Sequence, residues 1–107
     1  MIEICNLRNN KCVNIYDVRV DRASIFGNPF YMKDESMREE VCVKYQSYFL
    51  NRLNKDDIFR KEFDKLKEIY KKYRKLRLFC WCAPKKCHAE IIKFFIEYEL
   101  NGKYLSK

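Results

Sequence analysis

The stretch that most constrains this chain joins a short apolar run to a helical pattern further along. Leu76 to Trp81 is apolar enough for a buried strand, and Pro84 interrupts it before apolar residues recur at helical spacing from Ile91 onward. The stretch therefore predicts a strand, a turn from Cys82 to His88, and a helix, in that order. A turn of this kind, at the carboxyl end of a strand, is where α/β proteins bind their ligands.

Two further strands are predicted near the start of the chain, from Ile2 to Leu7 and from Val13 to Val20. Between them lies a polar turn, Arg8 to Lys11, whose two asparagines tolerate the left-handed backbone of a tight turn. This pattern predicts a β-hairpin. A long helical stretch separates the second strand from Leu76 to Trp81, so these two strands are expected to be parallel neighbours with adjacent carboxyl ends.

Three helices complete the pattern. The first opens at Ser36, which fits a capping box together with Glu39. The second runs from about Asp56 to Lys72, and the last from about Cys87 to Leu100. We therefore predict an α/β fold, with a small three-stranded sheet (an N-terminal hairpin plus one parallel strand) packed with about three helices. At 107 residues, the chain is expected to form a single domain over 1–107.

Charge and cysteine content narrow the expected partners and compartment. No apolar run reaches the length of about eighteen residues that spans a bilayer, and the N-terminus lacks the layout of a secretory signal. We therefore expect a cytosolic protein without a membrane partner, whose six cysteines remain thiols. The formal net charge of +8 favours an anionic partner, for which both nucleotides and nucleic acids qualify.

The expected strand order brings two distant segments together at one crevice. Arg22 and the loop around Asn28 follow the second strand, and the Cys82 to His88 turn follows the third. An arginine clamps phosphate, an asparagine recognises an amide or ribose edge, and a helix start attracts anions and lowers the pKa of a thiol. The candidate ligand-binding residues are Arg22, Ser24, Gly27, Asn28, Cys82, Lys85, Lys86, Cys87 and His88.

These residues predict a site for an anionic, nucleotide-like small molecule, with no cofactor. Glu90, one turn into the last helix, is the candidate general acid or base if the site cleaves the N-glycosidic bond of a nucleotide. Each candidate also has a structural interpretation. Cys80 and Trp81 fit the core, and Cys87 fits a plug between strand and helix.

Two alternative functions remain open. Cys80, Cys82, Cys87 and His88 are four potential zinc ligands, although their spacing is unlike that of zinc knuckles. The basic strip from Lys71 to Arg77 is a candidate nucleic-acid surface. Glu62, Asp64 and Glu68 interrupt the positive charge before it, so a solvated helix face is the competing interpretation.

Four short motifs, in this order, resemble a bacterial and phage family known as domain of unknown function 4326. They are Arg22-Ala23-Ser24, Gly27-Asn28-Pro29-Phe30, Arg38-Glu39, and Cys80-Trp81-Cys82 with Cys87-His88. The resemblance covers nearly the whole chain. This chain departs from the family at Ala89-Glu90, where members usually carry Gly-Asp, but it keeps the carboxylate. The resemblance supports the expected fold and the position of the site, and it implies no activity.

Overall fold

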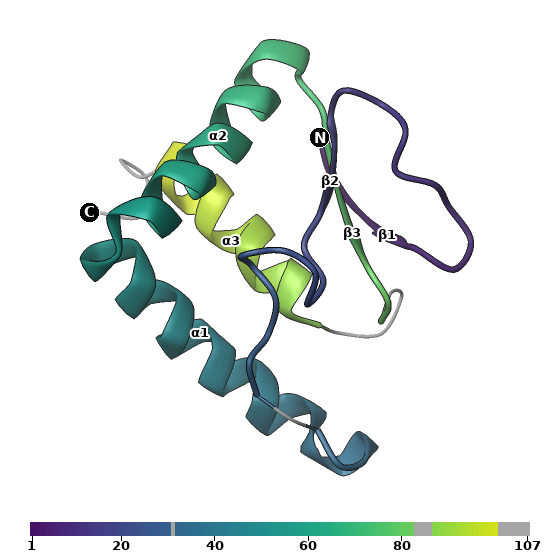
Figure 1. The fold of residues 1–107 in the computed structure, drawn as a ribbon, viewed down its shortest axis with the longest axis vertical. Helices are drawn as coiled ribbons and strands as arrows, with labels where there is room; N and C mark the ends of the chain where they lie inside the picture. The colour runs from purple at the N-terminus through teal and green to yellow at the C-terminus, as the bar shows by residue number, and fades with distance from the viewer. Residues whose placement is uncertain (31, 83–86, 101–107) are drawn as a thin grey trace.

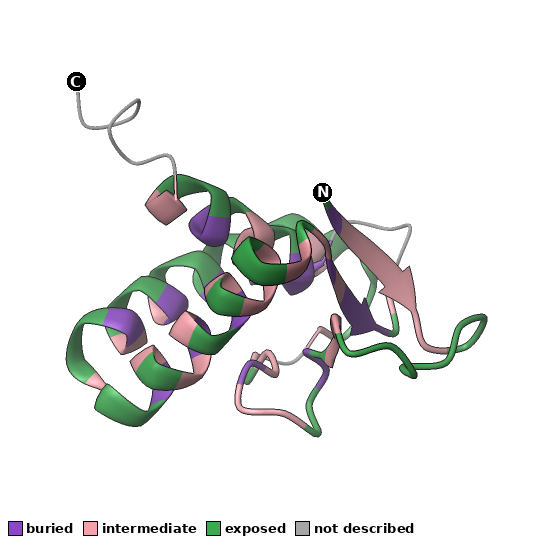
Figure 2. Cartoon of the chain, turned by 90° about the horizontal axis from the view of Figure 1, so that it is seen from above, coloured by how far each residue is buried: buried purple, intermediate pink, exposed green. Residues whose placement is uncertain are grey.

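The computed structural model describes residues 1–30, 32–82 and 87–100. Within these ranges the strands are β1 (Ile2–Asn6), β2 (Asp17–Arg19) and β3 (Leu76–Cys80). The helices are α1 (Arg38–Lys55), α2 (Asp57–Tyr73) and α3 (His88–Leu100), with a 3-10 turn, η1 (Glu35–Met37), before α1. All three α-helices lie on the same side of the sheet, as Figures 1 and 2 show from two directions. The α/β class is confirmed.

The sheet has the order β1-β3-β2, and β3 pairs in parallel with both of its neighbours. The predicted parallel pairing of the second and third strands is therefore confirmed. The predicted N-terminal hairpin is wrong, because β1 and β2 lie on opposite sides of β3. Burial explains why β3 takes the centre, since a strand flanked by parallel neighbours is buried on both faces. Leu76, Leu78, Phe79 and Cys80 are all fully buried.

The turn expected after the first strand does form, but it does not lead into hydrogen-bonded pairing between β1 and β2. The backbone N–H groups of Asn9 and Asn10 both donate to the carbonyl of Asn6. Downstream, the Asp17 carboxylate accepts the backbone N–H groups of Val13 and Asn14, at 3.1 and 2.9 Å. These backbone donors are thus held in a loop, so the second strand shortens to Asp17–Arg19.

Helix boundaries follow the capping side chains. The Asp56 carboxylate accepts the backbone N–H of Phe59 at 3.0 Å and so starts α2 one residue from its predicted position. The predicted capping box at Ser36 is wrong. Asp34 caps η1 instead by accepting the backbone N–H of Ser36, and the Ser36 hydroxyl bonds to the same carboxylate. Among the described residues, no helix is long and apolar enough to cross a membrane.

Aromatic rings dominate the core between the helices and the sheet. Phe49 of α1 is fully buried, and its ring centroid lies 5.0 Å from that of Phe59 and 5.2 Å from that of Phe95. Phe26, from the loop after β2, packs edge-on against Phe59 at 5.4 Å. The loop that follows β2 is therefore anchored in the same core as the helices.

Candidate functional site

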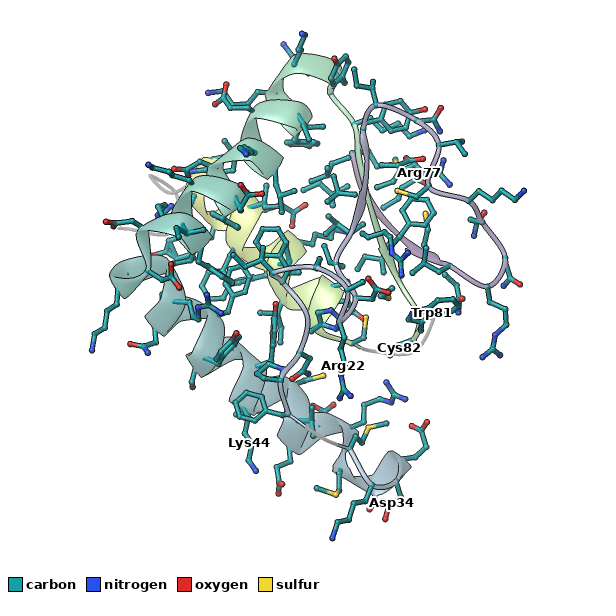
Figure 3. The ribbon with its side chains drawn as sticks, in the orientation of Figure 1. Arg22, Asp34, Lys44, Arg77, Trp81 and Cys82 are labelled. Carbon is teal, nitrogen blue, oxygen red and sulfur yellow. The ribbon has the colours of Figure 1, made fainter. Side chains whose placement is uncertain are left out.

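A cavity of about 500 Å³ opens beyond the carboxyl ends of β2 and β3. Its walls come from the loop after β2, the first turns of α1, the end of β3 and the start of α3. Figure 3 shows Arg22, Cys82 and Trp81 there, while Lys44 projects from the other side of α1. Much of the lining is apolar and includes Phe30, Met32, Val41 and Trp81. The volume is in the range of small-molecule sites, about 300–1,000 Å³.

The loop from Asp21 to Phe30 is shaped by its own hydrogen bonds. The Ser24 hydroxyl donates to the carbonyl of Asp21 at 2.8 Å and accepts the backbone N–H of Phe26. From α1, the Tyr45 hydroxyl donates to the Phe26 carbonyl at 2.6 Å. At Gly27 the chain passes so close to itself that a Cβ would lie 2.6 Å from the Cα of Arg22. The motif residues Ser24 and Gly27 therefore build the loop.

Arg22 and Asn28 are also hydrogen-bonded within this loop, and each keeps polar N–H groups that these bonds do not use. The Arg22 guanidinium donates to the carbonyls of Asn28 and Phe30, each at 3.2 Å. The Asn28 side-chain oxygen accepts the backbone N–H of Phe30 at 2.8 Å, and its amide N–H groups have no partner among the described residues. Among the described residues, Arg22 has no carboxylate partner. The loop therefore presents a positive charge and amide donors to the cavity.

Asp21 and Trp81 join the loop to the end of β3. Asp21 is 6% exposed. Its carboxylate accepts hydrogen bonds from the Trp81 indole N–H, at 2.9 Å, and from the Arg19 guanidinium. The hydrogen bond from Arg19 lowers the pKa of Asp21, so its charge is present and already balanced. The expectation that Trp81 belongs to the core is wrong. Its ring is 52% exposed and lines the cavity.

Arg38 is a second guanidinium in the lining. It forms a bidentate pair with Glu35, both distances being 2.8 Å, and Glu35, with a smaller effect of Cys82, raises the pKa of Arg38. The start of α1 and the turn after β3 therefore meet at the cavity. Because Glu35 balances the charge of Arg38 and Arg19 balances that of Asp21, the net positive charge of the described lining residues comes from Arg22.

Cys80 and Cys87 form a buried thiol pair, with their sulfur atoms 3.2 Å apart. The hydrogen bond with Cys80, followed by burial, raises the pKa of Cys87. The expectation that the helix start would lower the Cys87 pKa is therefore wrong. The structural interpretation fits Cys87 better, because the residue is buried between β3 and α3 against Cys80. Among the described residues, no three His, Cys, Asp or Glu side chains converge as a metal site would require.

His88 begins α3 and is a buried residue of the cavity lining, so we call the part of the cavity beside it the inner end. It is 8% exposed, its Nε2 lies 2.5 Å from the carbonyl oxygen of Val20, and its ring packs edge-on against that of Tyr45 at 5.2 Å. A carbonyl only accepts, so Nε2 carries the proton. Burial lowers the pKa of His88, and the ring is neutral near pH 7.

Comparison with known proteins places the chain in a family. Residues 5–98 match the family described as domain of unknown function (DUF4326). The chain belongs to the DUF4326 family. An uncharacterised 12.4 kDa protein from the nrdA-td intergenic region of Enterobacteria phage T4 is 30% identical over 87 residues, which cover 81% of this chain and 73% of that protein. No solved structure matches the chain significantly.

The structure brings most of the predicted site residues of this DUF4326 protein together. Those that line the main cavity are Arg22, Asn28, Cys82, Cys87 and His88. Arg22 and Asn28 also line a second cavity of about 370 Å³, where Ser24 and Gly27 lie. Lys85 and Lys86 lie outside the described residues. Glu90 is exposed and lines neither cavity.

Sequence reasoning missed Asp21, Arg38 and the apolar wall of the cavity. The Arg38-Glu39 motif at the predicted helix start was a usable signal for Arg38. Asp21 stands directly before Arg22, but nothing in the sequence indicated that its carboxylate would bind Trp81, 60 positions away. Met32 and Val41 carried no pattern beyond ordinary apolar character.

Stability should fall as the pH drops below neutrality, because of His88. In the unfolded chain, a histidine takes up a proton as the pH falls through about 6.5, whereas folded His88 resists protonation. The stabilisation present above that pH is therefore lost progressively below it. Burial is the main reason why His88 resists protonation, and the charge of Arg22 adds to it, whereas the hydrogen bond to Val20 and the charge of Asp21 favour protonation. The Tyr45 ring packs edge-on against the imidazole.

The measurement is the unfolding temperature between about pH 7.5 and pH 5. His88 is the single histidine of the chain, so His88→Gln should remove most of the decline in this range. The same decline in His88→Gln as in the wild type would assign it to another group.

Proposed function

We propose that this protein binds a nucleotide, or a similar phosphate-bearing small molecule, in the cavity beyond β2 and β3. The observation that carries the proposal is Arg22, an exposed guanidinium in the lining that no described carboxylate balances. Guanidinium groups match the geometry and charge of phosphate oxygens. The apolar wall that includes Phe30 and Trp81 would contact a flat ring.

The proposal concerns binding only. Glu90 lies outside the cavity, so it offers no acid or base for cleavage of a glycosidic bond, and the Asp21 carboxylate is occupied by Arg19 and Trp81. A cytosolic location, expected from the sequence, is part of the same proposal.

The test is a screen of adenosine, guanosine, cytidine and uridine 5′-monophosphates by thermal shift, followed by calorimetric titration of those that raise the unfolding temperature. We expect at least one to bind, and Arg22→Gln to weaken that binding by about tenfold or more, since a charged hydrogen bond is lost. Glutamine is chosen because its amide can still donate to one of the loop carbonyls that Arg22 holds.

Lys44→Gln is the matched control. It removes the same charge from an exposed position on the other side of α1, so it should leave the affinity unchanged. If none of the four monophosphates binds, or if Arg22→Gln binds as tightly as the wild type, the proposal is wrong.

Nucleic-acid binding by the Lys71 to Arg77 strip is the second candidate. Lys72 and Arg74 favour it, because neither is ion-paired among the described residues, whereas Lys71 pairs with Glu68 and Lys75 with Glu3. This candidate requires that Lys72→Glu weaken the binding of single-stranded DNA in a salt-dependent manner and that Asn28→Ala have no effect.

A further inference from the structure

The single uncommitted nitrogen of His88 restricts what can occupy the cavity. Nε2 donates to the carbonyl of Val20, so the lone pair of the neutral ring lies on Nδ1. Nδ1 has no partner among the described residues. Among these residues the one buried side-chain N or O atom without a partner is Oδ1 of Asp17, so Nδ1 of His88 is not fully buried. Since His88 is more than nine-tenths buried and lines the cavity, this acceptor opens onto the cavity.

Two kinds of polar group therefore line the cavity. The exposed Arg22 offers positive charge, and Asn28 offers amide N–H groups. The buried His88, at the inner end, offers an acceptor and no donor. A phosphate at the inner end would set its oxygens against the Nδ1 lone pair and would lose its water, which is costly for a charged group.

We propose that the inner end takes a neutral ring that donates a hydrogen bond from an N–H group to Nδ1 of His88, while the phosphate of the same ligand stays at Arg22. This inference rests on the proposed function and deepens it. The ligand class is then a nucleoside 5′-phosphate recognised through a base N–H, and inorganic phosphate or an inorganic polyphosphate is excluded. A ribose hydroxyl fits the inner position less well, because it lies next to the phosphate in such a molecule.

Two substitutions of His88 separate recognition from folding. In His88→Gln, the side-chain amide reaches the position of Nε2 and can still donate to Val20, but the acceptor at the position of Nδ1 is lost. In His88→Asn, the shorter side chain can place an oxygen near the position of Nδ1, but the bond to Val20 is lost. We expect His88→Gln to keep the unfolding temperature at pH 7.5 and to bind the tightest monophosphate of the screen about tenfold more weakly.

His88→Asn should show the reverse, namely an affinity within a few-fold of the wild type in the folded protein and a lower unfolding temperature. If His88→Gln binds like the wild type while Arg22→Gln binds weakly, this inference is wrong and the proposed function stands. If Arg22→Gln also binds like the wild type, both fail.

A second arm needs no variant of His88 and remains informative if His88→Gln does not fold. Wild-type protein is titrated with paired probes that differ in one base donor. These are adenosine monophosphate against purine riboside monophosphate, and uridine monophosphate against its N3-methyl derivative. We expect about a tenfold loss of affinity when the donor of the preferred base is removed. Equal affinities within both pairs, or binding of inorganic phosphate as tight as that of the nucleotide, would overturn the inference.

Discussion

Phe49→Ala is expected to lower the free energy of unfolding by about 3–5 kcal/mol. The ring is fully buried, and its centroid lies within 6.4 Å of five other aromatic rings, those of Phe26, Tyr45, Phe59, Phe63 and Phe95. These rings come from the loop after β2 and from all three helices, so the cavity left by the truncation has few ways to collapse. Domains of this size are stable by about 5–15 kcal/mol, so the loss is a large share of the total.

Urea unfolding followed by circular dichroism measures this effect. Phe94→Ala is the matched control, since it makes the same truncation on a ring that is 50% exposed. We expect it to cost less than about 1 kcal/mol. Equal costs for the two variants would mean that Phe49 is not at the centre of the core.

Gly27→Ala is expected to lower the free energy of unfolding by about 1–3 kcal/mol and to abolish the proposed binding of nucleotides. The added methyl group would lie 2.6 Å from the Cα of Arg22 and 2.9 Å from the carbonyl oxygen of Asp21. Both are backbone atoms and cannot rotate away, so the loop has to move. Arg22 and Asn28 would move with it, because both are hydrogen-bonded within this loop.

Ala23→Ser is the control, since it also adds one heavy atom to the loop, at an exposed position. It should change neither the unfolding temperature nor the binding of the monophosphates beyond experimental error. Full affinity in Gly27→Ala would show that the close approach at Gly27 does not position the ligand-binding groups.

Local signals predicted the elements whose structure depends on local interactions. The second helix was expected from about Asp56 to Lys72 and is found at Asp57–Tyr73, because its apolar periodicity and its aspartate cap agree. The strand from Leu76 was expected on its apolar content alone, and it extends to Cys80. These features depend on side chains a few positions apart, which a sequence displays directly.

The hairpin was mispredicted because strand order is decided by distant residues. A polar turn between two apolar runs is compatible with a hairpin and also with two strands that flank a third. The choice depended on Leu76–Cys80, the only one of the three strands that is buried on both faces, and on the Asp17 carboxylate, which withdraws Val13 and Asn14 from pairing.

The candidate site was predicted in outline and not in its electrostatics. Parallel strand ends placed Asn28 and His88 at one cavity, as the structure has them. The pKa of Cys87 was expected to fall, but it rises because Cys80 lies against it in a dry environment. Trp81 was expected inside, but it lies at the surface because the Asp21 carboxylate offers its indole N–H a partner there. The second pairing joins residues 60 positions apart, and the first depends on how the turn between strand and helix brings two thiols together, so neither can be recognised from a local pattern.

The order β1-β3-β2 also has a consequence for how the chain acquires its structure. During synthesis the first two strands emerge long before Leu76–Cys80, and neither has a neighbour to pair with until that segment leaves the ribosome. The sheet therefore cannot form stepwise from its N-terminal end, because its strand pairs join residues 60 or 74 positions apart in the chain. Nascent chains halted before Leu76 should accordingly contain helix but no sheet.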